Sequence, residues 1–268
     1  MQTSPLQSRE AILKETADEL LAAYETKTPV APLRNRIHAM TIEDAYDIQK
    51  LQLEHHLAAG RVLAGWKVGL TSPAMQKQLG VDSPDFGFFF KDMVHHDEAV
   101  IPAAEFISPK VEPEFGFILG KSLEGPGVTL QDAIDAIDSV YPAIEIIDSR
   151  ITDWDIKLVD TVADNASCGA IVVGRTPLPI SPEHLERVSC SLLIDGHVTG
   201  TGTGADVLGH PAAPLAWLAN VLGEQGVALE AGQLILPGSF TKAMPVVGNS
   251  SATADFGGFG ALTIYFND

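Results

Sequence analysis

Apolar residues recur at helical spacing over the first sixty positions of the chain. From residue 8 to 27 they return every three or four positions, which predicts an amphipathic helix. The segment 28–32 contains two prolines and interrupts this pattern. A second helix is expected to begin with Thr41 as its N-cap and to end at Gly60. We therefore expect an N-terminal helical portion over residues 1–60.

After residue 60 the pattern changes to short apolar runs that are typical of strands. Strands are expected at 61–70, 110–119, 141–148, 168–174, 233–236 and 261–266. The turn Asp195-Gly196 predicts a hairpin between two further strands, 188–194 and 197–201. Helices are expected at 72–80, after the N-cap Thr129, and at 211–222 with Gly223 at the C-terminal end.

Many strands, one hairpin and interspersed helices predict an α+β fold. We expect a mixed, β-rich core over residues 61–268, with the N-terminal helical layer either separate from this core or continuous with it. A doubly wound sheet would need a regular alternation of strands and helices, which residues 160–205 do not have.

Composition supports a packed protein and limits its partners. The 268 residues include 35 acidic and 17 basic side chains, a formal net charge of −18, and 46% are hydrophobic. This charge argues against nucleic acid and against an anionic membrane surface as partners. The sequence shows no signal peptide and no apolar run of about 20 residues. Two cysteines do not form a disulfide framework, so we expect a cytoplasmic protein.

Three acidic residues stand in runs that are otherwise apolar. Glu112 and Glu114 are two positions apart, so a strand places them on one face, where like charges repel. Glu145 stands alone in an apolar run, and ionised carboxylates are rarely buried without a partner. Together they could bind Mg²⁺ or Mn²⁺ through oxygen. Alternatively, the first two lie on a solvated face and Glu145 pairs with Arg150.

Three other polar parts of the sequence are candidates for function. Lys67, in an apolar strand, either extends to solvent or faces a pocket that holds an anionic substrate or a catalytic carboxylate. Segment 81–87 is expected to form a turn. Segment 160–167 is expected to form a polar loop. Its Asp and Asn side chains either cap the turn or accompany a Ser167 that hydrogen-bonds the substrate. Cys168 is expected to be a small buried strand residue rather than a nucleophile.

Five motifs follow one another in an order that resembles a known family. They are GWKVGLTS at 65–72, DSPDFG at 82–87, PKVEPE at 109–114, EIIDSR at 145–150 and DTVADNASCG at 160–169. The chain resembles the 2-keto-4-pentenoate hydratase (2-hydroxypenta-2,4-dienoate hydratase) and 4-oxalocrotonate decarboxylase family of the fumarylacetoacetate hydrolase superfamily. The resemblance extends from residues 29–34 to residues 234–239 and implies a β-rich mixed core with an N-terminal helical portion.

The resemblance implies a metal site on the acidic residues already singled out, Glu112, Glu114 and Glu145, with Mg²⁺ or Mn²⁺ as the cofactor. Pro113 departs from the family's usual filler between the two glutamates. Because proline has no N–H to donate, we expect this strand to lie at a sheet edge or to bulge there.

The resemblance also implies the reaction. A small anionic 2-hydroxydienoate would be hydrated to a 4-hydroxy-2-oxoalkanoate during meta-cleavage degradation of aromatic compounds. Asp85 would transfer protons, Lys67 would hold the substrate anion and tune Asp85, and Ser167 would orient substrate or water.

Homo-oligomers are implied as well, and the enzyme is expected to associate with a downstream aldolase or a sister decarboxylase. The alternatives are a 4-oxalocrotonate decarboxylase and a non-catalytic subunit that stabilises a partner.

Overall fold

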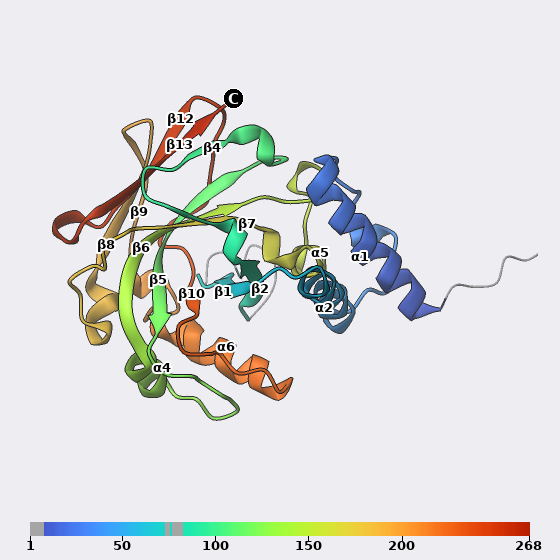
Figure 1. The fold of residues 1–268 in the computed structure, drawn as a ribbon, viewed down its shortest axis with the longest axis horizontal. Coiled ribbons are helices and arrows are strands. Elements are labelled where there is room, and N and C mark those ends of the chain that lie inside the picture. Colours follow the sequence, from blue (N-terminus) through green and yellow to red (C-terminus); the bar gives the residue numbers. More distant parts are fainter. Residues whose placement is uncertain (1–7, 73–75, 77–82) are drawn as a thin grey trace, which may run out of the picture.

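Two mixed sheets form the centre of the molecule in the computed structural model, which describes residues 8–72, 76 and 83–268 (Figure 1). Within these residues the larger sheet has eight strands, in the order β2-β1-β10-β5-β6-β7-β3 with β11 paired to β5. The pairs β1–β10 and β3–β7 are parallel and the others antiparallel. Its strands are β1 (Leu63–Gly69), β2 (Asp85–Phe90), β3 (Val94–His96), β5 (Lys110–Leu119), β6 (Ile137–Ile147), β7 (Cys168–Val173), β10 (Leu234–Leu236) and β11 (Met244–Pro245).

The smaller sheet packs against the larger one through aromatic side chains. Its strands run in the order β4-β13-β12-β8-β9, and the Phe256 ring next to β12 stacks on Phe115 of β5 at a centroid distance of 5.3 Å. The expected hairpin is present: Asp195 and Gly196 both have positive φ, as a tight two-residue turn requires. The strands are β4 (Val100–Pro102), β8 (Ser189–Ile194), β9 (His197–Thr203), β12 (Ser250–Asp255) and β13 (Ala261–Asn267).

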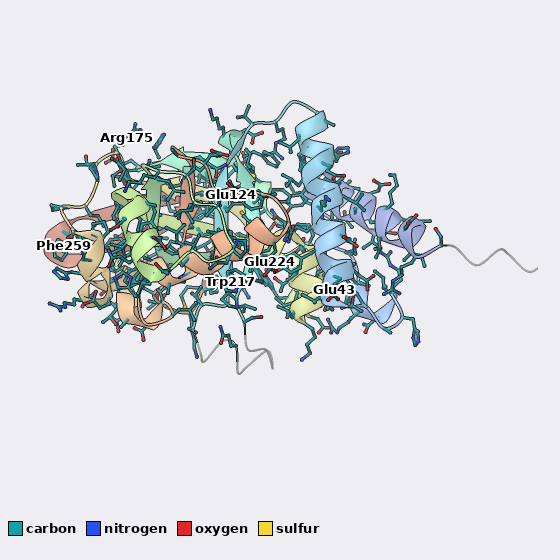
Figure 2. All side chains as sticks on the ribbon, turned by 90° about the horizontal axis from the view of Figure 1, so that it is seen from below. Glu43, Glu124, Arg175, Trp217, Glu224 and Phe259 are labelled. Atoms are coloured by element: carbon teal, nitrogen blue, oxygen red, sulfur yellow. The ribbon has the colours of Figure 1, made fainter. Side chains whose placement is uncertain are left out.

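The helices form two groups around the sheets. Helices α1 (Arg9–Thr26) and α2 (Ile42–Ala58) pack with α5 (Leu158–Ala163) on one side, around buried Leu20, Ile48 and Val162 (Figure 1). Glu43 on α2 and Phe259 lie on opposite sides of the molecule (Figure 2). Helices α4 (Leu130–Ala136) and α6 (Ala212–Glu224) pack under the sheets. No helix in the described part of the chain is long and apolar enough to cross a membrane.

The predicted α+β fold with a β-rich mixed core is confirmed. Thr41 caps α2 through a reciprocal pair of hydrogen bonds with Asp44, as its position indicated. The expected helix at 72–80 falls largely outside the described residues. Because α1 and α2 share their apolar cluster with α5, the division of the chain at residue 60 stays a prediction.

Three local predictions are wrong. The end of the expected turn at 81–87 belongs to β2, where four phenylalanines are buried on the two faces of the strand. The expected loop at 160–167 begins within α5, because the Asp160 carboxylate accepts the N–H of Lys157 and starts a helix. Gly223 lies inside α6, which ends at Glu224.

Candidate metal centre and active site

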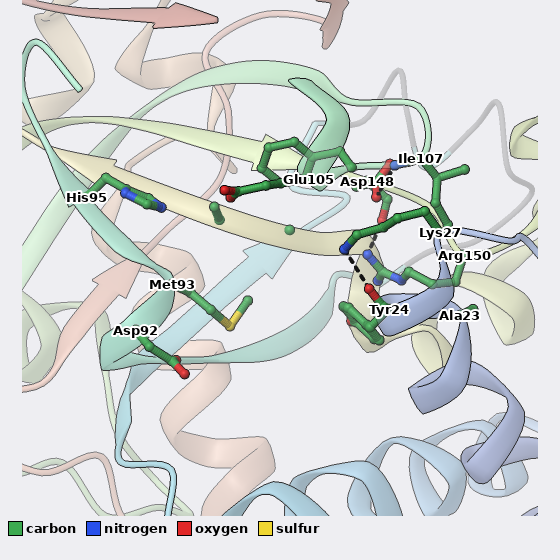
Figure 3. Close-up of a pocket in the computed structure, with 13 residues that line it drawn as sticks. Ala23, Tyr24, Lys27, Asp92, Met93, His95, Glu105, Ile107, Asp148 and Arg150 are labelled. Atoms are coloured by element: carbon green, nitrogen blue, oxygen red, sulfur yellow. Dashed lines mark hydrogen bonds between the residues drawn. The ribbon is translucent and has the colours of Figure 1, made fainter. Parts of the chain in front are cut away.

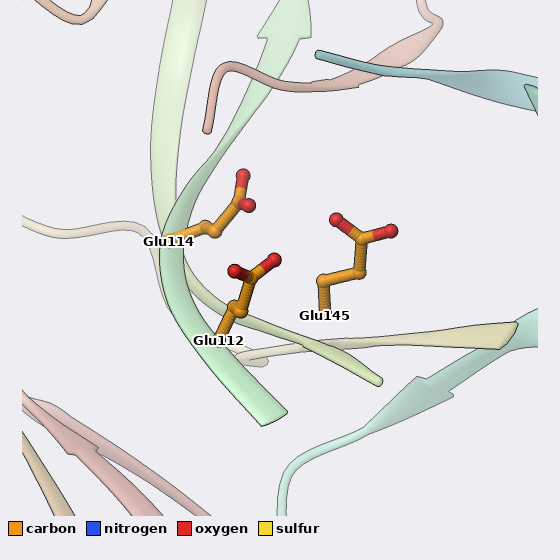
Figure 4. A group of neighbouring side chains, drawn as sticks. All are labelled: Glu112, Glu114 and Glu145. Carbon is orange, nitrogen blue, oxygen red and sulfur yellow. The ribbon is translucent and has the colours of Figure 1, made fainter. Parts of the chain in front are cut away.

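Glu112, Glu114 and Glu145 meet on one face of the larger sheet (Figure 4). Glu112 on β5 lies directly opposite Glu145 on β6, and Glu114 follows two residues later on the same face. Ligand oxygens of the three side chains lie within 4.8 Å of one another, and the residues are 7%, 1% and 1% exposed. The alternative of a solvated face is therefore wrong. Arg150 does not pair with Glu145, because its Nε donates to Asp164 Oδ1 at 2.6 Å.

Pro113 lies inside the sheet rather than at an edge or a bulge. The register between β5 and β6 is unbroken from residue 110 to residue 118. On its other side β5 pairs with β11 at 110–111 and with β10 at 117–118, and Pro113 falls between these two pairings. Its carbonyl accepts the N–H of Phe240 at 3.1 Å. Proline is accommodated here because no neighbouring strand offers an acceptor for an N–H at this position.

Lys67 and Asp85 face the acidic residues from β1 and β2. The Lys67 Nζ lies 3.3 Å from Glu145 Oε1, and both side chains are buried, so Lys67 faces the pocket rather than solvent. Asp85 lies opposite Gly69 in the register between the two strands. A Cβ atom at Gly69 would overlap Asp85 Oδ1 and lie 3.5 Å from Lys67 Nζ. Glycine at this position therefore leaves room for the two charged groups.

Burial and mutual repulsion perturb the acids. Burial, together with the charge of Glu145, raises the pKa of Glu112 to about 8, and the same causes raise the pKa of Glu114 well above its ordinary value. Burial also raises the pKa of Glu145 and of Asp85, against the opposing charge of Lys67. Burial lowers the pKa of Lys67, but the surrounding carboxylates outweigh it and the net pKa is raised. Four buried carboxyl groups are thus balanced by one ammonium group, that of Lys67.

A cavity of about 110 Å³ brings these groups together with Ser167. Ser167 closes a turn in which Asn165, Ala166 and Ser167 have φ values of 52°, 48° and 56°. Its hydroxyl lies 3.3 Å from that of Thr161. Glu145 is not among the residues that line this cavity, although it contacts Lys67. The other five predicted site residues line it together with an apolar wall. The lining includes Lys67, Asp85, Glu112, Glu114 and Ser167, and the wall comprises Leu70, Ile147, Trp154 and Ile156.

Two contacts of the acidic residues were not predicted from the sequence. The N–H of Gly238 donates to Glu114 Oε2 at 2.8 Å and holds that carboxylate in place. Gly238 follows β10 with a φ of 118°, a conformation that only glycine adopts readily. The dipeptide Pro237-Gly238 could therefore have indicated a tight turn at this position. Cys168 is buried at the start of β7, as expected, and burial together with the nearby charge of Glu145 raises the pKa of its thiol.

The donor set fits a divalent cation. Carboxylate oxygens are the ligands that Mg²⁺ and Mn²⁺ prefer, and three of them converge here. Oδ1 of Asp85 is buried and has no hydrogen-bond partner among the described residues, and Oε1 of Glu145 has none there beyond its ion pair with Lys67. One ammonium group does not neutralise this cluster, so a bound cation would remove much of the cost of burying it.

Residues 66–265, which include all six predicted site residues, match the model of the fumarylacetoacetate (FAA) hydrolase C-terminal family. The chain belongs to this family, as the five motifs indicated. It is similar to 2-keto-4-pentenoate hydratase of Paraburkholderia xenovorans, with 42% identity over 94% of each chain. It is also similar to 2-oxo-hept-4-ene-1,7-dioate hydratase of Escherichia coli, with 41% identity over 85% of this chain and 87% of that protein.

Among solved structures, the chain is similar to 4-oxalocrotonate decarboxylase from Pseudomonas putida complexed with magnesium and adipate. The TM-score is 0.91 and the identity 34%, over 98% of this chain and 100% of that one.

Proposed function

We propose that this protein is a metal-dependent hydratase that converts 2-hydroxypenta-2,4-dienoate, or a close homologue, into a 4-hydroxy-2-oxoalkanoate. The observation that carries the proposal is the buried carboxylate trio, which contacts Lys67 and of which Glu112 and Glu114 line one cavity together with Lys67 and Asp85. Hydratase names among relatives that are 42% and 45% identical confirm the prediction of a hydro-lyase. The reaction belongs to the degradation of aromatic compounds.

Glu112, Glu114 and Glu145 would hold the cation, which we take to be Mg²⁺ or Mn²⁺. A bound divalent ion supplies Lewis-acid stabilisation of negative charge on a substrate oxygen. Magnesium in the structurally similar decarboxylase supports this choice. The Gly238 N–H keeps Glu114 oriented toward the centre of the trio, so the ligand geometry is largely formed by the fold itself.

Asp85 is suited to move protons between water and the substrate carbon. Burial raises its pKa, so the carboxyl group can hold a proton and release it to carbon, and its carboxylate form can take one from water. The reaction has two parts. In the first, the C2 hydroxyl loses its proton as it becomes a ketone, and C5 gains one. In the second, the oxygen of one water forms the new C–O bond at C4 and keeps one proton, and C3 gains the equivalent of the other, with Asp85 as the group that carries the protons.

Lys67 and Ser167 would orient the reacting groups. The raised pKa of Lys67 keeps its ammonium group charged, so it can attract the substrate carboxylate and hold Asp85 and Glu145 in place. The Ser167 hydroxyl at the cavity wall can bind substrate or water. In a chain with a net charge of −18, this ammonium and the cation supply the local positive charge that an anionic substrate needs.

We also propose that the enzyme is a cytoplasmic homo-oligomer that associates with a downstream aldolase or a sister decarboxylase. Both cysteines are buried and neither is in a disulfide, which supports a reducing compartment.

The second candidate is the decarboxylase of the same family, which the similarity to 4-oxalocrotonate decarboxylase favours. Incubation with 2-hydroxypenta-2,4-dienoate and, separately, with 4-oxalocrotonate distinguishes the two. A hydratase produces 4-hydroxy-2-oxopentanoate, identified by NMR, from the first substrate and no CO₂ from the second. Release of CO₂ without hydration would establish the decarboxylase, and turnover of neither substrate would support a non-catalytic subunit.

A further inference from the structure

Strand β2, which carries Asp85, forms an edge of the larger sheet. Within the described residues it pairs with β1 and with no strand on its other side. The backbone of Phe86 and Phe88 points to that outer side, and both residues are buried. Buried backbone groups need hydrogen-bond partners, because leaving them unpaired costs free energy. The strand that presents Asp85 therefore depends on partners from outside the sheet.

Side-chain amides occupy this outer edge. The N–H of Phe88 donates to Asn165 Oδ1 at 2.8 Å, and Asn165 Nδ2 donates back to the carbonyl of Phe88 at 2.8 Å. Gln49 Nε2 on α2 donates to the carbonyl of Phe86 at 2.8 Å and to that of Val162 at 3.0 Å. Asn165 thus offers β2 the donor and acceptor that a neighbouring strand would provide. Asn165 is 2% exposed and Gln49 is 3% exposed, so water does not compete for these bonds.

Asn165 also begins the turn that presents Ser167. The three residues of this turn have left-handed backbones, which residues other than glycine adopt only when their surroundings impose it. At the far end of the turn, the Ser167 carbonyl accepts the N–H of Asp148 at 2.8 Å. At the near end, the main chain of Asn165 approaches Gly87 so closely that a Cβ there would lie 2.5 Å from the Asn165 carbonyl oxygen.

We propose that Asn165 is a positioning residue of the active site, whose amide fixes the Ser167 turn against the strand that carries Asp85. This inference rests on the proposed function. Asp85 and Ser167 line the cavity from these two segments, whereas Asn165 does not line it. Asn165 therefore acts through the relative placement of the two groups. Glu112 and Glu114 lie on β5, outside this amide pair, so metal binding does not depend on it.

Asn220 provides a matched control for substitution of Asn165. Its amide forms the same reciprocal pair with the main chain of Val128, accepting at 2.8 Å and donating at 2.9 Å. This pair joins α6 to the segment before α4 and is not part of the cavity lining. Asn220→Ala removes the same kind of reciprocal pair and one further bond, from the N–H of Gly127 at 2.7 Å, and only Asn165→Ala loosens the proposed active site.

The experiment measures kcat and KM for 2-hydroxypenta-2,4-dienoate, Mn²⁺ affinity and Tm for both variants. We expect kcat of Asn165→Ala to fall about 10- to 100-fold, with KM within about threefold of the wild-type value, since a displacement near 1 Å is enough for such a loss. Mn²⁺ affinity stays unchanged. Asn220→Ala lowers Tm similarly but keeps its kcat. Asn165→Asp keeps the acceptor and loses the donor, so its kcat is intermediate.

A kcat of Asn165→Ala within about twofold of that of Asn220→Ala would overturn the inference. If Asn165→Ala does not fold, Gly87→Ala tests the same point, because the added methyl group displaces the turn while the amide remains. Wild-type kcat in folded Gly87→Ala would equally overturn it. Lack of turnover by the wild-type enzyme is a separate result that would refute the proposed function, and the inference with it.

Discussion

Glu112 makes the stability of the metal-free protein fall as the pH rises. Its pKa is raised to about 8 in the folded state, against an ordinary value of 4.5 that applies after unfolding. The folded state therefore binds this proton more tightly, and the resulting stability is complete below pH 4.5 and is lost as the pH rises toward 8. The interval of about 3.5 pH units corresponds to about 5 kcal/mol in the free energy of unfolding.

Urea unfolding in the presence of a chelator, at fixed protein concentration between about pH 5 and 8.5, measures this loss. Glu112→Gln keeps the size of the side chain but cannot ionise, so the pH dependence of its unfolding free energy should be weaker by several kcal/mol over the same range. Glu124→Gln, at an exposed position, should behave as wild type. Saturating Mn²⁺ should flatten or reverse the wild-type dependence, because the ion binds the deprotonated carboxylates. Equal pH dependence for Glu112→Gln and wild type would refute the reasoning.

Three substitutions test other parts of the site and its support. Lys67→Met should lower kcat/KM by at least about 100-fold in steady-state assays, and a wild-type value would remove Lys67 from the active site. Asp85→Asn should lower kcat by about 10²- to 10⁴-fold with KM little changed, and an unchanged kcat would exclude proton transfer by Asp85. Asp164→Asn leaves the buried Arg150 without its ion-pair partner, and it should cost about 3–5 kcal/mol in urea unfolding. An unchanged unfolding midpoint would contradict that expectation.

The carboxylate trio could be predicted from the sequence because strand periodicity is local. Two residues apart on an apolar strand, Glu112 and Glu114 must share a face, and the observed strand spans the predicted residues 110–119. Glu145 stood out as an acid within a buried run. The direct register of Glu112 with Glu145 is a tertiary fact, however, so the residues alone offered a shared metal site only as one of two interpretations, and the motif resemblance favoured it.

The strand that carries Asp85 could not be predicted from its own residues. Asp85 and Gly87 are residue types that are typical of turns, so the sequence predicted a turn there. The strand depends instead on Asn165 and Gln49, which come from distant parts of the chain and hydrogen-bond its outer edge. The prediction of a sheet edge or bulge at Pro113 was wrong for the same reason, because it too depended on contacts with distant parts of the chain. The missing N–H excludes strand pairing on one side, but only the fold shows that β5 has a gap there between two partners. Local sequence identifies polar residues more readily than the long-range contacts that accommodate them.

The most direct test of the metal-dependent hydratase is turnover of 2-hydroxypenta-2,4-dienoate by chelator-treated enzyme as Mn²⁺ is added back. Because Glu112, Glu114 and Glu145 form one cluster, activity should be absent without metal and should saturate at one ion per chain. Glu145→Gln should need far more Mn²⁺ for the same rate. Full activity in enzyme whose metal content is shown by mass spectrometry to be negligible would contradict the assignment.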